Sequence, residues 1–504
     1  MKSTIVLTLL AALLLLPAAA SASSTQMSII QDDATFVYGS GRDIETSVAE
    51  AKLIGADAIR VFISWHSVAP TPNSRRQPAR FDAGNPDSPG YQWAMYDALV
   101  DRARRNGLKL LMVLSPAIPF WASEQPRRCP HLIGGYQQLG KSCMWKPSPA
   151  LFAQFVKAAV RRYGSTATSA GGAYGGQVAL WSLWNEPNLE HYVWPQLQHS
   201  RYGVIDLGAA RYRQLWLAGW KAIAKYDPPS RDKVLFGETA AISSPMDTLY
   251  AALCLDEEGN PFKGRMRALQ GCGKAPRLPI AGLALHPYNN YAIGSVFTRS
   301  HTKDSLAMGY VSRAHTLLDR AARHGRIPRG RGIYVTEFGF QSSPPNPFGD
   351  ALSLGRQAAA INEADRLFFG DPRVRSVAQY ELYDVGNPGE FNTGLRFADG
   401  GAKPSLVAYR MPLVATRLGA DRVEVWGQVR PANRRARPVI SIARGMAAGA
   451  VVGRPLTNAS GYYRFVVSRR GAGSLSYRAS WTDPDGETLR SRVAAAGKPI
   501  KYHE

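Results

Sequence analysis

Two glutamates stand at the ends of apolar runs that have the pattern of buried β-strands. Glu186 lies in WSLWNEPN, residues 181–188, between an amide and a proline, and Glu337 lies in GIYVTEFGF, residues 332–340. Paired carboxyl groups suit the cleavage of a glycosidic bond, because one can protonate the departing oxygen while the other attacks the anomeric carbon. The pair predicts this chemistry if the fold brings both side chains to one place.

The elements that must position this pair form a repeating pattern along the chain. Short β-branched or apolar strands alternate with helical patterns closed by Gly or Pro, which is typical of βα units around a parallel sheet. We count eight such strands, in residues 34–40, 58–65, 108–115, 178–186, 233–239, 281–288, 332–340 and 376–384. Eight units predict an α/β fold, a (β/α)₈ TIM barrel, which we place at residues 30–415.

The barrel explains why a carboxylate should stand where a buried strand ends. Active sites of such barrels form at the carboxyl ends of the strands. Glu186 ends the fourth strand and Glu337 ends the seventh, and these two strands face each other across a closed barrel of eight. We therefore expect a separation of about 5 Å, the spacing of a retaining glycosidase.

Other side chains at strand ends are candidates to position the two glutamates or to bind a sugar. Arg60, on the second strand, is a cation that could keep one carboxyl ionised. Glu238, ending the fifth strand, is a further carboxylate that could tune the acid or only bond a loop. Three tryptophans at or just beyond strand ends offer faces for stacking on sugar rings, although packing explains them equally well: Trp65, Trp121 and Trp184.

The segments WNEPN and TEFG, at this separation, resemble the paired signatures of glycoside hydrolase clan A, the (β/α)₈ retaining enzymes. The resemblance covers about residues 35–409 and implies that Glu186 is the acid/base and Glu337 the nucleophile. It also implies that Asn185 holds a sugar hydroxyl, that Arg60 supports the nucleophile, and that His286 and Tyr288 line the same subsite. No cofactor and no metal is implied.

Different segments of the chain resemble different families of the clan. The segments around Glu186, His286 and Glu337 resemble family five, the cellulases and mannanases, whereas FISWHSVAP and LSPAIPFWAS resemble family thirty-nine. Many relatives place a tryptophan under the sugar at the end of the eighth strand. This chain has Gln379 followed by Tyr380 there, so we expect Tyr380 to stack instead.

The remaining chain, residues 418–504, has short alternating strands separated by turns such as NASG and DPDG. This pattern predicts a small all-β sandwich. The stretch TNASGYYRF resembles immunoglobulin-like and carboxypeptidase-regulatory-like modules. Its excess of basic residues allows adhesion to an anionic cell-surface polymer. The whole chain carries a formal net charge of +23, yet its basic residues are scattered, so we expect no nucleic-acid partner.

The N-terminus predicts export. Lys2, an apolar run and the small residues ASAS have the layout of a signal peptide at residues 1–22, cleaved after Ala22, and the run is too short for a membrane span. A secreted protein is the context in which four cysteines form disulfides. Local pairs are expected, Cys129 with Cys143 and Cys254 with Cys272, although the sequence alone allows three connectivities and zinc is the disfavoured alternative.

Two functions from different classes follow. The first is a secreted retaining glycosidase that acts on a polysaccharide or oligosaccharide. The second is a protein with the same barrel fold that binds carbohydrate or a cell surface without catalysing a reaction. Retention of both carboxylates favours the enzyme.

Overall fold

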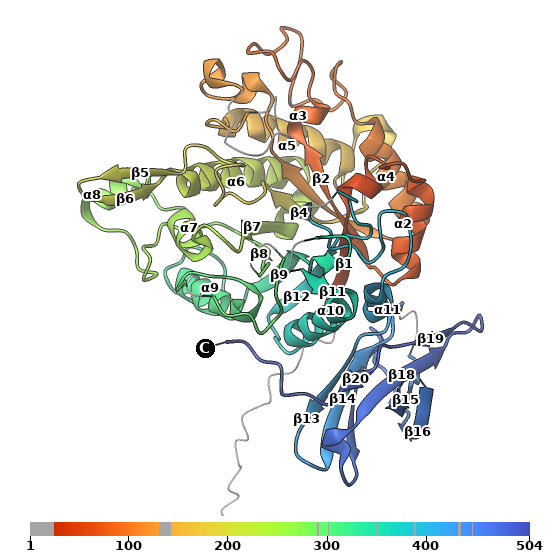
Figure 1. The fold of residues 1–504 in the computed structure, drawn as a ribbon. Helices are drawn as coiled ribbons and strands as arrows, with labels where there is room; N and C mark the ends of the chain where they lie inside the picture. Colours follow the sequence, from red (N-terminus) through yellow and green to blue (C-terminus); the bar gives the residue numbers. More distant parts are fainter. Residues whose placement is uncertain are drawn as a thin grey trace, which may run out of the picture.

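The computed structural model describes residues 25–130, 143–289, 292–300, 302–347, 351–387, 390–431, 435–445 and 447–503. The signal peptide predicted at residues 1–22 lies outside these ranges. The described chain forms an α/β barrel followed by two antiparallel sheets (Figure 1). Both parts of the predicted architecture are confirmed.

Eight parallel strands close the barrel in the order β1-β12-β9-β8-β7-β4-β3-β2. The strands are β1 (Met27–Gln31), β2 (Ala58–Ser64), β3 (Lys109–Ser115), β4 (Val178–Leu183), β7 (Val234–Ala240), β8 (Gly282–His286), β9 (Gly332–Phe338) and β12 (Val374–Tyr380). The surrounding helices are α2 (Ile44–Leu53), α4 (Ala94–Arg105), α5 (Pro149–Tyr163), α6 (Leu207–Tyr226), α7 (Pro245–Ala252), α9 (Arg313–Arg323), α10 (Leu354–Phe369) and α11 (Pro404–Arg410). The expectation that the strands of Glu186 and Glu337 face each other is wrong, because in this cyclic order β4 lies opposite β12 and β9 lies opposite β3. Strands β7 and β8 separate β4 from β9 on the shorter path around the barrel.

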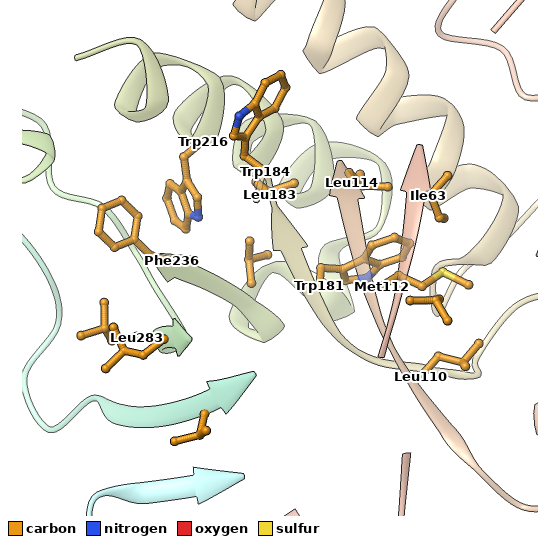
Figure 2. Packing of buried hydrophobic residues seen from close by; sticks show 14 of the residues in the cluster. Ile63, Leu110, Met112, Leu114, Trp181, Leu183, Trp184, Trp216, Phe236 and Leu283 are labelled. Carbon is orange, nitrogen blue, oxygen red and sulfur yellow. The ribbon is translucent and has the colours of Figure 1, made fainter. Parts of the chain in front are cut away.

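Alternation along each strand separates two cores. In β3, Leu110, Met112 and Leu114 face the helices, and Figure 2 shows them beside Trp181 and Ile63. Leu111 and Val113 face inward, where they meet Ile29, Ala58, Leu180, Leu235, Ala284 and Ala378. Because side chains alternate with a period of two, the next inward position on several strands is polar. That position holds Gln31, Arg60, Ser182, His286 and Thr336.

The first strand is not where the pattern predicted it. Residues 34–40 were expected to be extended, but the strand is Met27–Gln31, which pairs with both β12 and β2. Asp32 ends it by capping the short helix α1 (Asp33–Phe36), since its Oδ1 accepts the Thr35 N–H at 2.9 Å. This cap overrides the β-propensity of Thr35, Phe36 and Val37. The barrel therefore starts before residue 30.

The C-terminal part is a sandwich of two sheets around one apolar core. One sheet contains β13 (Leu413–Arg417), β14 (Arg422–Gln428) and β17 (Tyr462–Ser468); the other contains β15 (Val439–Arg444), β16 (Ala447–Gly453), β18 (Ser476–Thr482), β19 (Thr488–Arg490) and β20 (Ala494–Ala495). Val425 and Val467 from one sheet share that core with Ile440 and Tyr477 from the other. Because β13 pairs with β14, the boundary expected between residues 415 and 418 falls inside or just after this strand.

The final residues return to the barrel (Figure 1). Tyr502 donates its hydroxyl to Asp371 Oδ2 at 3.0 Å, and the His503 ring lies 5.0 Å from that of Tyr310. The sandwich is thus held to the barrel at both of its ends.

Candidate active site

Arg60 is the centre of a polar cluster at the carboxyl end of the barrel. Its side chain is fully buried, and the two terminal nitrogens contact carboxylates from two other strands. Nη1 lies 2.6 Å from Glu337 Oε1, and Nη2 lies 2.5 Å from Glu238 Oε2. Gln31 also accepts from Nη1, and Asn185 Oδ1 accepts from Nη2 at 3.2 Å. One guanidinium therefore holds Glu337 and Asn185 in place.

His286 links the remaining carboxylates. Its Nδ1 lies 2.9 Å from Glu186 Oε1 and its Nε2 lies 2.8 Å from Glu238 Oε2. Burial opposes a charge on the ring, but the charge of Glu337 and the hydrogen bonds to Glu186 and Glu238 raise the pKa of His286 to about 9. These interactions favour the protonated form of the ring, in which both nitrogens are donors.

Glu238 is the carboxylate whose role the sequence left open, and the structure places it beneath the pair. Its Oε2 accepts from Arg60, His286 and Thr336, and its Oε1 accepts from Ser182. Burial acts to raise its pKa, but the charge of Arg60 and the hydrogen bond from His286 lower the pKa to about 2. Glu238 is therefore a permanent anion that anchors Arg60 and His286.

Glu186 differs from Glu238 in its environment. Burial raises the pKa of Glu186, and the nearby charge of Glu337 adds to this against the opposing effect of His286. Its side chain is 14 % exposed, whereas that of Glu238 is 1 % exposed. A raised pKa suits a carboxyl group that gives up a proton during a reaction.

The backbone around Glu186 adopts a conformation that L-residues rarely occupy. Glu186 has φ 39°, Trp184 has φ 83° and Glu238 has φ 51°. The Glu186 N–H donates to the Glu238 backbone oxygen at 2.9 Å, which joins the ends of β4 and β7. Positive φ at non-glycine residues is concentrated at functional sites, and here it turns the Glu186 side chain over the barrel.

An aromatic wall borders Glu337. Tyr288 donates its hydroxyl to Glu337 Oε2 at 3.2 Å, and its ring lies 6.4 Å from Tyr380 and 5.6 Å from Phe391. All three rings are partly exposed. Tyr288 and Tyr380 were expected here, whereas Phe391 lies in a loop after β12 that carries no motif, so no sequence signal indicated it.

The three tryptophans proposed as stacking faces do not supply them. Trp65 is fully buried and stacks on Phe155 with 5.2 Å between ring centroids. Trp184 is fully buried and donates to the Tyr192 backbone oxygen, and Trp121 donates to that of Pro70. Their large apolar rings are used for packing between strands and helices, which corrects the expectation.

Glu186, His286 and Glu337 are also the one group of ligand-type residues within reach of a single ion in the described part of the chain. Their ligand atoms lie within 4.8 Å of one another. His286 uses its two ring nitrogens in contacts with Glu186 and Glu238, and the Arg60 guanidinium contacts Glu337. All three ligand-type residues are thus engaged by protein partners.

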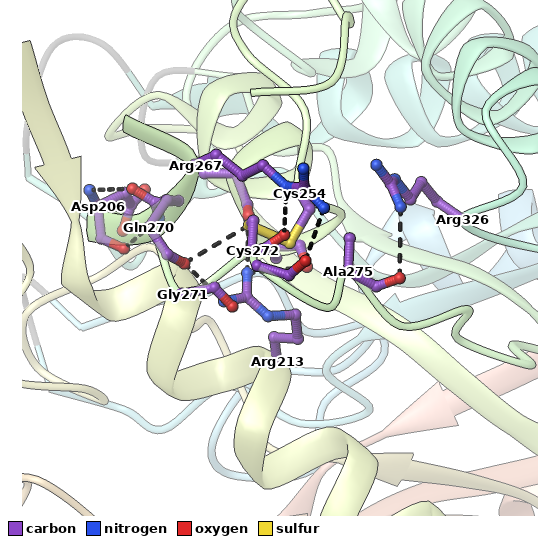
Figure 3. The surroundings of a disulfide bond; sticks show 12 residues. Asp206, Arg213, Cys254, Arg267, Gln270, Gly271, Cys272, Ala275 and Arg326 are labelled. Atoms are coloured by element: carbon purple, nitrogen blue, oxygen red, sulfur yellow. Dashed lines mark hydrogen bonds between the residues drawn. A yellow bond between two sulfur atoms is a disulfide. The ribbon is translucent and has the colours of Figure 1, made fainter. Parts of the chain in front are cut away.

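Both predicted disulfides are present, and their pairing is local as expected. Cys129 bonds to Cys143 and Cys254 bonds to Cys272. The second bond lies beside the loop between α7 and β8, next to Arg213 and Gln270 (Figure 3).

Among the described residues, no helix combines the length and apolar character required to cross a membrane.

No protein-family model and no curated protein matches this chain. A glucosidase from Croceicoccus marinus matches in structure with a TM-score of 0.50 and 13 % identity, over 89 % of this chain and 81 % of that one. This chain has the fold of that glucosidase. An intracellular xylanase from Thermoanaerobacterium saccharolyticum matches with a TM-score of 0.43 and 14 % identity, over 78 % of this chain and 97 % of that one.

Proposed function

We propose that this protein is a secreted retaining glycoside hydrolase of clan A that cleaves a polysaccharide or oligosaccharide. The observation that carries the proposal is the separation of the two carboxyl groups: ligand oxygens of Glu186 and Glu337 lie within 4.8 Å of each other. Retaining enzymes place their carboxyl groups about 5 Å apart, whereas inverting enzymes leave about 6.5–9.5 Å for a water molecule. The present spacing is close to the retaining value and supports that class.

Glu337 has the surroundings of a nucleophile. Arg60 donates to its Oε1 at 2.6 Å and Tyr288 donates to its Oε2 at 3.2 Å. Both interactions orient the carboxylate, and neither donor is a competing base. Glu186, whose pKa is raised by burial, has the surroundings of the proton donor.

The reaction then proceeds in two displacements. In the first, Glu186 gives its proton to the glycosidic oxygen as the bond from that oxygen to the anomeric carbon breaks, and Glu337 forms an ester to the same carbon. In the second, Glu186 takes a proton from water, the water oxygen bonds to the anomeric carbon, and Glu337 leaves as a carboxylate. His286 Nδ1, 2.9 Å from Glu186 Oε1, positions the acid/base for both steps.

The surroundings of the pair suit a sugar ring. Tyr288, Tyr380 and Phe391 offer partly exposed aromatic faces beside Glu337, and aromatic faces stack on the apolar faces of sugars. Asn185, held by Arg60, is placed to bind a sugar hydroxyl. The two disulfides favour an exported protein. Adhesion of the basic sandwich to an anionic surface polymer stays a prediction.

Substitution of each carboxylate tests the proposal. We expect Glu337→Gln to lower the rate of reducing-end release at least about 10⁴-fold, and Glu186→Gln to lower it about 10²–10⁴-fold. The substrates are panels of glucans, mannans, xylans, arabinans and bacterial exopolysaccharides. Glu45→Gln, a change on the exposed face of α2, serves as the control with unchanged activity.

Stereochemistry separates the two roles. Azide added to Glu186→Ala should yield a glycosyl azide of retained configuration, because the ester to Glu337 still forms first. Azide added to Glu337→Ala should yield the inverted product, because it replaces the nucleophile. Binding of a polysaccharide by wild type without any hydrolysis across the panel would contradict the proposal and support a non-catalytic carbohydrate-binding protein.

A further inference from the structure

A cavity of about 690 Å³ opens beside the loop that carries Glu186. Its lining begins at Asn188, two residues after Glu186, and continues along the hairpin β5 (Leu197–Ser200) and β6 (Gly203–Asp206) to α7 and the loop closed by Cys254–Cys272. Asn188 exchanges hydrogen bonds with the Ala240 backbone and also donates to Ile242 O, so it ties the loop after β4 to the loop after β7. The cavity therefore reaches the loop that carries the proposed acid/base, two residues beyond Glu186.

The walls of the cavity are held in place without a ligand. Arg213 of α6, which is buried, donates to the backbone oxygens of Ala251 at 3.0 Å and Gln270 at 2.7 Å. The Gln270 side chain bonds in turn to the backbone of Asp206, and the disulfide lies beside these contacts (Figure 3). A preformed wall is what a binding site requires, because little ordering entropy is then lost on binding.

The lining has two chemical characters. Leu197 and Val204 of the hairpin are 57 % and 50 % exposed, and Phe262 belongs to the same cavity lining. The other character is acidic: the lining includes Glu190, Asp206, Asp247, Asp256, Glu257 and Glu258, and its described residues include no Lys or Arg. Apolar side chains left exposed in a hollow indicate a ligand, and the carboxylates set its charge.

Most of these carboxylates lack a cationic partner. The charge of Arg213 acts on Asp206, but none of the five that follow Glu190 in the lining forms an ion pair with Lys or Arg within the described residues of a chain whose net charge is +23. Burial and the charges of Asp304, Glu257 and Asp206 raise the pKa of Asp247 to about 6, which reflects this crowding of like charges. The acids also do not gather three ligand atoms as a metal site does, since in the described part of the chain that arrangement occurs only at Glu186, His286 and Glu337. Dispersed carboxylates suit several cationic groups spread along a chain.

The position of the cavity determines which part of a substrate would enter it. A general acid lies on the side of the departing sugar, because it protonates the oxygen of that sugar. We propose that the cavity beside Asn188 binds a saccharide that carries protonated amino groups, so that the departing part of the substrate is an amino-sugar unit. This inference rests on the proposed function for the direction of the substrate, but the binding itself does not require turnover.

Binding is measured by calorimetry on Glu337→Gln protein, which is expected to be unable to turn over substrate. The probes are glucosamine and galactosamine oligosaccharides and their fully N-acetylated counterparts, at a pH where the amines are charged. We expect the amino forms to bind about tenfold more tightly, a difference of about 1.4 kcal/mol, because several partly exposed charge pairs form only with them. Added salt should weaken this preference.

Removal of the acidic charges should abolish the preference. Asp247→Asn combined with Glu257→Gln and Glu258→Gln should make the amino and N-acetylated forms bind alike. A second variant, Glu257→Lys with Glu258→Lys, changes only exposed side chains and should disfavour the amino forms. Asp232→Asn, an exposed acid before β7 at the opposite end of the barrel, is the matched control and should retain the preference.

The outcomes distinguish this inference from the proposed function. Equal binding of amino and acetylated forms to Glu337→Gln, or a preference that survives both cavity variants, overturns the inference even if wild type hydrolyses neutral glycans. A preference that the cavity variants remove, in a protein without hydrolysis on any substrate, sustains the cavity as an amino-saccharide site while the proposed function fails.

Discussion

At the residue scale, the site depends on a carboxylate that does not touch the proposed substrate. Glu238 accepts hydrogen bonds from Arg60, His286 and Thr336, and Arg60 and His286 in turn hold Glu337 and Glu186. Its pKa is lowered from 4.5 to about 2 by Arg60 and His286, against the effect of burial. Because the folded value is the lower one, its ionisation stabilises the fold above pH 4.5 and is lost as the pH falls through about 2.

We expect Glu238→Gln to lower the free energy of unfolding by about 3 kcal/mol at neutral pH, because Arg60 loses a buried partner. The loss should shrink as the pH falls from 4.5 toward 2, where wild type itself becomes protonated. Urea denaturation across this range measures it. Ser182→Ala removes one neutral hydrogen bond to the same carboxylate and should cost only about 1 kcal/mol; equal losses for both variants would contradict the role of the charge.

At the element scale, the loop between α7 and β8 is the segment that depends most on covalent closure. Helix α8 (Gly264–Leu269) has no buried residue, so packing contributes little to its position. Cys254–Cys272 closes the loop with a sequence separation of 18. Arg213 adds hydrogen bonds from α6 to the same loop.

We expect Cys254→Ser with Cys272→Ser to lower the free energy of unfolding by about 3 kcal/mol, as the closure of a loop of this length suggests. Hydrogen exchange should rise in residues 253–275 and in the β5–β6 hairpin, and remain unchanged in β9. Exchange that rises equally in all barrel strands would show that the bond stabilises the whole fold rather than this loop.

At the scale of the whole molecule, the barrel and the sandwich share a buried junction. Arg430, which follows β14, lies 3.3 Å from Asp365 of α10 and donates to the Tyr409 backbone oxygen at 2.8 Å. Phe369 of α10 packs between Trp426 and Tyr462 of the sandwich. Gly55 has φ 98°, and a Cβ there would lie 2.5 Å from Arg430 Cβ, so the two parts approach closely.

We expect calorimetry of the wild-type protein to show one cooperative unfolding transition. Unfolding of either part alone would expose the buried junction on the other part and cost free energy. Arg430→Met leaves Asp365 buried without its cation and should cost about 3 kcal/mol or separate the transition into two. Arg410→Met, which removes a more exposed pair with Glu487, is the control and should cost less than about 1 kcal/mol. Two transitions in wild type would contradict a single cooperative unit.

The sequence by itself determined the barrel, the proposed catalytic pair and the local disulfides. Periodicities of two and about 3.6 residues follow from backbone geometry, so strands and helices are visible before any contact is known. The count of the strands and the positions of their ends then assign Glu186 and Glu337 to the carboxyl end of the barrel. The short sequence separations favour a bond between the first two cysteines and another between the last two.

The tertiary structure decided what depends on neighbours distant in the chain. The Asp32 cap moved the first strand to Met27–Gln31, and packing buried Trp65, Trp121 and Trp184 that could equally have faced a sugar. The role of Glu238, the place of Phe391 and the acidic cavity beside Asn188 all arise where separate loops converge. Burial, pKa and cavity shape are properties of that convergence, because each depends on which groups from other strands surround a side chain and exclude water from it.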